Sequence, residues 1–152
     1  MTLTNGAVAK LSAYNRDAVL SASPVRLLTM LYDRLVLDLS RAEAALGEQN
    51  WPVGWENLRH ADRILDELSS SLRLDAWDGA DGLLQLYTYV SGLIVTAGIE
   101  RDVDKVREAR ALIEPLRETW HEAAALLPAA GAGTTYGASS SPAGEARDLG
   151  IA

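Results

Sequence analysis

The feature that most constrains the fold is an apolar stripe that returns four times along the chain at helical spacing. Its first copy steps by three or four residues through Leu28, Leu31, Leu35, Leu39, Ala42 and Leu46. Such steps place the side chains on one face of a helix. The other copies run over residues 58–72, 83–97 and 106–127. Leucine and alanine, both strong helix formers, supply 24 residues each of 152. The pattern predicts an all-α, antiparallel up-down-up-down four-helix bundle.

Residues that favour helix ends frame these stripes. Ser23 is placed to cap the first helix, with Pro24 at its first position. Gly47 is expected to end it in the left-handed conformation. Asp102 is expected to cap the last helix, and Pro115 to kink it about one turn earlier.

Three regions follow from these boundaries. Residues 1–22 are a mixed segment with weak helical periodicity, which we interpret as an N-terminal cap arm. Residues 23–127 hold the four stripes and form the bundle. Residues 128–152 are rich in alanine, glycine and serine, a composition that predicts a disordered tail.

The third stripe lies in a helix, expected at about 81–98, that lacks a charged face. Residues 82–99 carry no charge, yet seven of them are glycine or polar, so the segment is too polar and too short for a convincing membrane span. Such a helix is usually covered on more than one side. Apolar residues off the stripes, such as Met30 and Leu37, add to this surplus. Either the arm or a dimer partner covers this surplus apolar surface, or the surface forms a groove for a partner's amphipathic helix.

Few residues can support chemistry. The chain has no cysteine and two histidines, so thiolate sites are excluded and most histidine sites are too. The one Glu-x-x-His spacing, Glu118 with His121, flanks the stripe residue Trp120, so both should point away from the core. Turn formation explains the acidic residues of 75–82 better than calcium binding. We expect no catalytic residue, no cofactor and no metal: the protein is not an enzyme.

His60 supports one alternative. An exposed histidine on a bundle helix is typical of phosphotransfer domains, but Asp62 lies close by and would repel a phosphoryl group. An ordinary solvated histidine is the favoured interpretation, and phosphotransfer is the less favoured one.

The charge disfavours nucleic acid as a partner. Asp and Glu number 21 against 14 Lys and Arg, a net charge of −7, whereas nucleic-acid binders usually present a basic face. The first twenty residues contain no continuous apolar run, so they are not a secretory signal, and we expect a cytoplasmic protein without membrane insertion.

Several blocks in order resemble the FliS family of flagellar secretion chaperones. The most specific is the segment 14–33, which contains Ser-Ala-Ser-Pro followed by Met-Leu-Tyr-Asp. Ile64-Leu65-Asp66-Glu67-Leu68, Leu86-Tyr87-Thr88-Tyr89 and Leu116-Arg117-Glu118-Thr119-Trp120 follow. The resemblance covers residues 11–125. Arg34 departs from the family's common Gly or Ala, and Gly98 from its common Asn.

The resemblance implies a four-helix bundle with an N-terminal cap. It also implies binding of the disordered C-terminal segment of flagellin, which prevents premature polymerisation and assists delivery to the export gate. The expected partners are that segment and the cytoplasmic domain of the export gate, and the expected state is a monomer or weak homodimer. An adaptor for another client is the alternative binding function.

The residues expected to serve binding fall into two groups. The arm would be anchored through Leu11, Tyr14 and Val19. The groove candidates share a position off the main stripes: Met30, Leu37, Ile64, Leu84, Tyr89 and Val95. Ser23, Pro24, Leu28 and Leu31 are interpreted as structural.

Overall fold

The fold is all-α, as predicted. The computed structural model describes residues 6–7, 9–10, 12–13, 16 and 23–127. The helices of the bundle are α2 (Pro24–Gly47), α3 (Trp51–Ser71), α4 (Ala80–Glu100) and α5 (Val103–Ala125), and the described residues contain no strand. Leu11, Tyr14 and Val19 lie outside the described residues, as does the tail from 128 onward, so the interpretations placed on them stay predictions.

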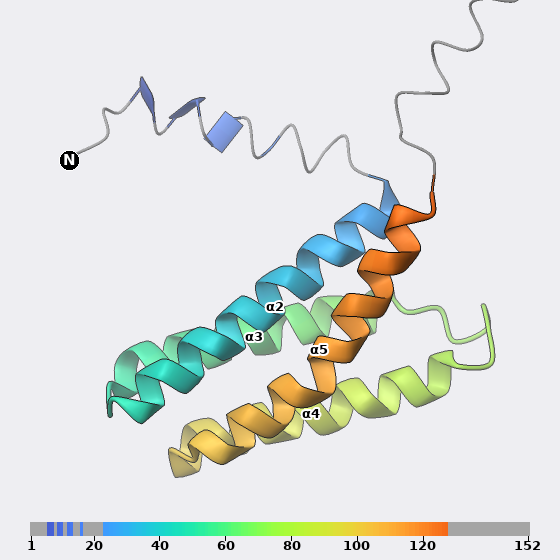
Figure 1. The fold of residues 1–152 in the computed structure, drawn as a ribbon. Helices are drawn as coiled ribbons and strands as arrows, with labels where there is room; N and C mark the ends of the chain where they lie inside the picture. The colour runs from blue at the N-terminus through green and yellow to red at the C-terminus, as the bar shows by residue number, and fades with distance from the viewer. Residues whose placement is uncertain (1–5, 8, 11, 14–15, 17–22, 128–152) are drawn as a thin grey trace, which may run out of the picture.

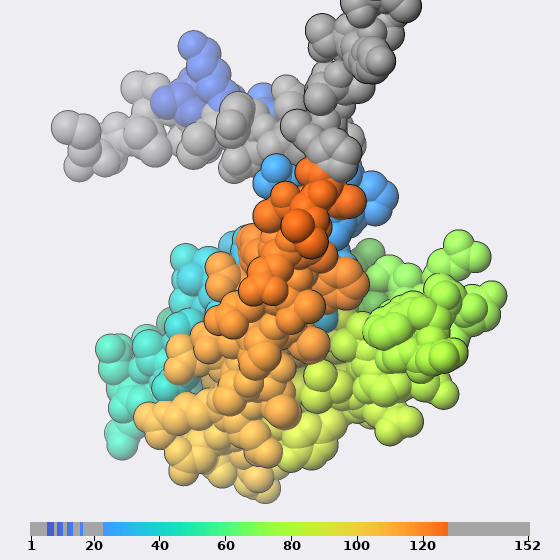
Figure 2. Space-filling model, turned by 45° about the vertical axis from the view of Figure 1, so that its right-hand side comes forward, coloured from blue at the N-terminus to red at the C-terminus, as the bar shows by residue number. Residues whose placement is uncertain are grey.

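The four helices form a closed ring of neighbours. α2 packs against α3 and α5, and α4 packs against the same two helices. Successive helices run in opposite directions, so α2 begins and α5 ends at the same end of the bundle (Figure 1). In the view of Figure 2, α5 (orange) lies across the molecule between α2 (cyan) and α4 (yellow-green). This is the predicted antiparallel bundle.

The two predicted caps, Ser23 and Asp102, are confirmed, Asn50 is a third cap, and one predicted helix end is wrong. The side chains of Ser23, Asn50 and Asp102 accept hydrogen bonds from backbone N–H groups at the starts of α2, α3 and α5. Gly47 is the last helical residue of α2, and the left-handed position falls on Gln49, with φ 61°. The helix therefore ends later than the glycine indicates, because an amide-bearing residue takes the strained conformation.

The stripes form one core. Its fully buried members include Leu35 and Leu39 from α2, Val90 from α4 and Ile113 from α5. Tyr32 and Tyr87, both buried, hydrogen-bond to each other through their hydroxyl groups across the core. The core thus satisfies the two phenolic groups that it buries.

α5 crosses α2 and is held there by charged pairs. Pro115 lies inside α5, and Figure 1 shows the helix axis changing direction along its length, as expected where a backbone donor is missing. Arg107 Nε lies 2.9 Å from Glu43 Oε1, and Arg117 Nε lies 2.6 Å from Asp33 Oδ1. These pairs tie the two halves of α5 to α2.

α4 keeps an uncharged outer face over residues 82–99. By length and composition it could cross a membrane, the only described helix of which this is true. Its inner face, which includes Tyr87, Val90 and Ile94, is buried in the bundle. Its outer face leaves Tyr89, Val95 and Ile99 between two-fifths and three-quarters exposed. α3 and α5 pack against α4, and a further cover by the N-terminal arm or a dimer partner stays a prediction.

Candidate protein-binding surface

An apolar strip follows the edge between α3 and α4. Trp55 of α3 is 45% exposed and lies against the backbone of α4 at Gly98, where a Cβ would come within 2.3 Å of its ring. Val95 and Ile99 are exposed beside it, at 43% and 72%. We call Trp55, Val95 and Ile99 the α3/α4 strip. Because glycine brings the indole close to the helix, the strip is continuous rather than a set of separate side chains.

Two hollows adjoin the α3/α4 strip. One, of about 380 Å³, is lined by Trp51, Trp55, Gly98, Ile99 and neighbouring residues. A smaller one, of about 60 Å³, lies between Trp55 and Val95. At the rim of the larger hollow, the Arg101 guanidinium stacks 4.8 Å from the centroid of the Trp51 ring, a cation–π contact. The strip therefore has concave places that apolar side chains of a partner would fill.

A second apolar hollow, of about 560 Å³, lies at the start of α2. α2 lines it with Pro24, Leu27, Leu28, Met30 and Leu31, and α3 contributes Glu67 and Ser71. It is almost entirely apolar on the α2 side, and it adjoins the point where residues 1–22 join the bundle. We call it the α2 hollow.

The predicted groove residues do not converge on one groove. Met30, at 36% exposed, lines the α2 hollow, Leu37 is exposed elsewhere on α2, and Val95 belongs to the α3/α4 strip. Tyr89 is exposed, but its hydroxyl donates a hydrogen bond of 2.7 Å to Glu108 Oε1 on α5, which raises the pKa of Tyr89. Leu84 is half-buried.

Ile64 is the groove candidate that the structure contradicts. It is 6% exposed and belongs to the core of α3, together with Leu65 and Leu68. A helix that packs against two neighbours buries a face wider than its narrow stripe, so a residue next to the stripe is covered as well. Sequence reasoning missed Trp55 and Ile99. Trp55 continues the α3 stripe backward, and nothing in that spacing shows that its ring lies at the surface.

His60 is not a free histidine. Its Nδ1 hydrogen-bonds to Oδ2 of Asp38, whose side chain is fully buried, while the imidazole itself is 44% exposed. Asp38 also accepts a bond from Arg34 Nε at 3.1 Å. The prediction of a solvated histidine is therefore right about exposure and missed this partner.

Glu118 and His121, the one Glu-x-x-His pair in the sequence, lie on the outside of α5. Glu118 and His121 are exposed, as predicted, and His121 Nε2 lies 2.6 Å from Asp33 Oδ1. Within the described part of the chain, no three carboxylate or histidine side chains are grouped to hold an ion.

These features define a class. The described bundle offers apolar strips and hollows on its outside, and surfaces of this kind are typical of proteins that bind other chains. Comparison with known proteins then identifies the family. The chain matches the family described as "Flagellar protein FliS" over residues 7–126. It therefore belongs to the FliS family, whose members are flagellar secretion chaperones and not enzymes.

Relatives support this assignment across most of their length. The "Flagellar secretion chaperone FliS" of Escherichia coli strain K12 is 32% identical over 108 residues, which cover 70% of this chain and 79% of the relative. That of Bacillus subtilis strain 168 is 28% identical over 116 residues, covering 74% and 84%. A structure titled "Crystal structure of flagellar chaperone from bacteria" shares the fold, with a TM-score of 0.62, 23% identity, and coverage of 75% and 96%.

Proposed function

We propose that this protein binds the C-terminal segment of flagellin in the cytoplasm, prevents its premature polymerisation and assists its delivery to the flagellar export gate. The observation that carries the proposal is the α3/α4 strip, formed by Trp55, Val95 and Ile99, which leaves large apolar side chains unpartnered on a bundle that already has a full core. Exposed apolar patches of this kind mark sites for partner chains.

The strip suits a client that folds as it binds. A disordered segment loses conformational entropy when it orders, so it needs a long apolar surface to bind at all. An amphipathic helix would place side chains spaced by three or four residues into the hollows beside Trp55. The long, charge-free surface of α4 offers such a track.

The N-terminal arm is proposed to compete with the client for the α2 hollow, which the flagellin segment would occupy in addition to the α3/α4 strip. The α2 hollow adjoins the point where residues 1–22 enter the bundle, and an arm that occupied it would shield apolar surface until flagellin arrives. Deletion of residues 1–18 is then expected to tighten flagellin binding and to expose the α2 hollow to hydrogen exchange. Unchanged affinity together with unchanged exchange would contradict this role of the arm.

A substitution on the strip tests the binding site. We expect Val95→Asp to weaken binding of a fluorescent peptide from the C-terminal segment of the organism's flagellin by about tenfold, because a carboxylate would be buried at the centre of the interface. Fluorescence anisotropy measures the affinity. Leu74→Asp is the matched control, since Leu74 is 53% exposed in the connection between α3 and α4. Equal affinity of the two variants would contradict the proposed site.

A further inference from the structure

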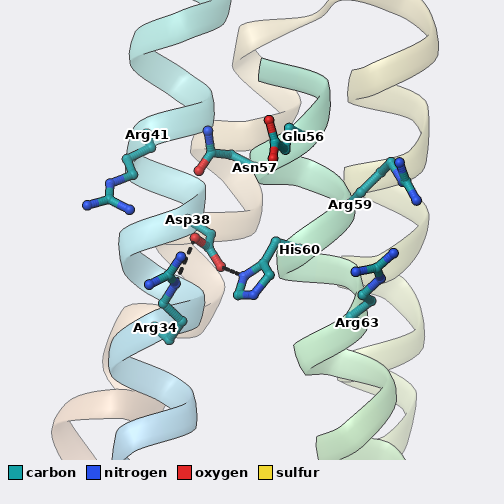
Figure 3. Close-up of a pocket in the computed structure, with 8 residues that line it drawn as sticks. All are labelled: Arg34, Asp38, Arg41, Glu56, Asn57, Arg59, His60 and Arg63. Carbon is teal, nitrogen blue, oxygen red and sulfur yellow. Dashed lines mark hydrogen bonds and ion pairs between the residues drawn. The ribbon is translucent and has the colours of Figure 1, made fainter. Parts of the chain in front are cut away.

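The outer face of α2 and α3 carries a basic hollow on an otherwise acidic protein. The hollow, of about 420 Å³, is lined by four arginines against two carboxylates, with His60 and Asn57 between them. The lining residues are Arg34, Asp38, Arg41, Glu56, Asn57, Arg59, His60 and Arg63 (Figure 3). With His60 neutral its net charge is +2, whereas the whole chain carries −7. We call this surface the arginine face.

Of the four arginines of this face, one is ion-paired, and the other three have no ion-pair partner among the described residues. Arg34 donates to the buried Asp38, which also binds His60, so that Asp38 fixes both side chains at the middle of the face. Arg41, Arg59 and Arg63 have no ion-pair partner among the residues that the structure describes. On α5 the pattern is the opposite, since its arginines pair with carboxylates of α2. The arginine face is therefore short of negative charge.

The four guanidinium groups of the face, Arg34 included, stand in two rows. Arg34 and Arg41 are seven residues apart on α2, about 10 Å along the helix. Arg59 and Arg63 are four residues apart on α3, about 6 Å. Figure 3 shows the two rows on either side of the Asp38–His60 pair. A helical segment laid along the face would meet a cation on each side at intervals of one to two turns.

We propose that the arginine face binds an acidic helical segment of a partner protein, a segment other than the apolar one that the α3/α4 strip takes. Guanidinium groups bind carboxylates in a planar, two-bond geometry, and arginine clusters recognise acidic motifs in this way. Partner carboxylates spaced by three, four or seven residues would match the two rows. The matching charges would steer association and fix the register of the segment.

The charge distribution favours a peptide over nucleic acid. A continuous phosphate backbone would meet Glu56 within the face and the net charge of −7 over the whole chain. An acidic peptide places its carboxylates only opposite the arginines. Arg59 also lines the small hollow beside Trp55, so the arginine face and the α3/α4 strip share a border. Arg41 and Arg63 do not line that hollow, and they are the positions for the test.

The test uses the full chain and two synthetic alanine-based helical peptides, one with glutamates spaced by three, four and seven residues and one with lysines in their place. Fluorescence anisotropy should show binding of the glutamate peptide alone, weakening as salt rises. Arg41→Glu with Arg63→Glu should reduce that affinity by about tenfold or more. The control, Arg26→Glu with Arg73→Glu, makes the same charge change at exposed positions outside the face and should alter it less than about threefold.

The outcomes separate this proposal from the proposed function. Both double variants should keep the helical circular dichroism and the flagellin-peptide affinity of the unmodified protein. Failure of the glutamate peptide to bind, or equal weakening by the two double variants, would overturn the arginine face as a site. Stronger binding of a single-stranded RNA oligonucleotide of equal charge would overturn the choice of partner. Loss of flagellin-peptide binding in the Arg41/Arg63 variant would show that flagellin uses the arginine face too. It would overturn the proposal that this face is a site separate from the α3/α4 strip.

Discussion

At the residue scale, the core contains a polar pair whose two members depend on each other. Tyr32 and Tyr87 are fully or almost fully buried, and their hydroxyl groups form a hydrogen bond. Burial raises the pKa of both hydroxyl groups, and the hydrogen bond between them raises the pKa of Tyr87 further, so both remain protonated. The bond links α2 to α4, which stand at opposite corners of the ring of helices.

Loss of one of the two hydroxyl groups should lower the free energy of unfolding more than loss of both. We expect Tyr32→Phe to lower the free energy of unfolding by about 1–3 kcal/mol, because the buried Tyr87 hydroxyl then loses its partner. The double variant, with Tyr87→Phe added, should recover part of that loss, since no polar group is left unpaired. Urea unfolding followed by circular dichroism measures both values. A double variant less stable than the single one would contradict the account.

The ionisation of Asp33 makes the stability of the folded protein depend on pH in the acid range. Partial burial raises the pKa of its carboxyl group, but the hydrogen bonds and positive charges of His121 and Arg117 outweigh burial, so the pKa lies below its ordinary value of about 3.9. Ionised Asp33 therefore favours the folded state at higher pH, and this contribution is lost as pH falls through the lowered pKa. Water screens the half-exposed pair, so the contribution is at most about 1 kcal/mol.

This pH dependence predicts that Asp33→Asn loses less stability in acid than the unmodified protein does. Asp33→Asn should be less stable than the unmodified protein at neutral pH and should lose less stability between neutral pH and about pH 3. Urea midpoints at the two pH values provide the measurement. Asp66→Asn, at an exposed carboxylate of α3, is the control and should keep the full acid effect. Identical pH dependence of Asp33→Asn and the unmodified protein would rule out this role for Asp33.

At the element scale, the contact between α3 and α4 depends on a missing side chain. A Cβ at Gly98 would collide with the ring of Trp55, whereas a Cβ at Gly92 in the same helix meets nothing within 4 Å. Gly92→Ala should stabilise the protein by about 0.5–1 kcal/mol, because alanine loses less backbone entropy in a helix.

Gly98→Ala should not show that stabilisation, and it should displace the side chain of Trp55. The indole must leave the backbone of α4, so we expect a shifted tryptophan fluorescence maximum, lower stability than Gly92→Ala and weaker binding of the flagellin peptide. Thermal unfolding and fluorescence spectra of the two variants give the comparison. Equal stability and equal spectra for both variants would show that Gly98 does not seat Trp55.

The helices were predictable because local signals for them are strong. The spacing of Leu35 and Leu39, and the caps at Ser23 and Asp102, act within one or two turns and survive in the fold. Asp38 lies on the same inward face and is fully buried. Sequence reasoning treats a charged residue as exposed, and only the packing of α3 beside α2 brings His60 to this carboxylate.

At the scale of the whole molecule, the bundle followed from the four stripes, but the location of its binding surfaces did not. Which faces stay open depends on how the helices neighbour one another, and that arrangement covers Ile64 while it leaves Val95 exposed. Trp55 joins the surface only through Gly98, a contact between residues 43 positions apart in the sequence. Surplus apolar surface could be predicted from the sequence, and its distribution over separate hollows required the structure.

The central claim is that this chaperone of the FliS family binds flagellin by burying apolar surface. Isothermal titration calorimetry with a peptide of the C-terminal segment of flagellin, at several temperatures, tests it most directly. The account predicts binding at micromolar concentration or tighter, with a clearly negative change in heat capacity, because ordering the segment on the bundle removes apolar area from water. Absence of binding at about 10 μM, or a heat-capacity change near zero, would contradict the claim.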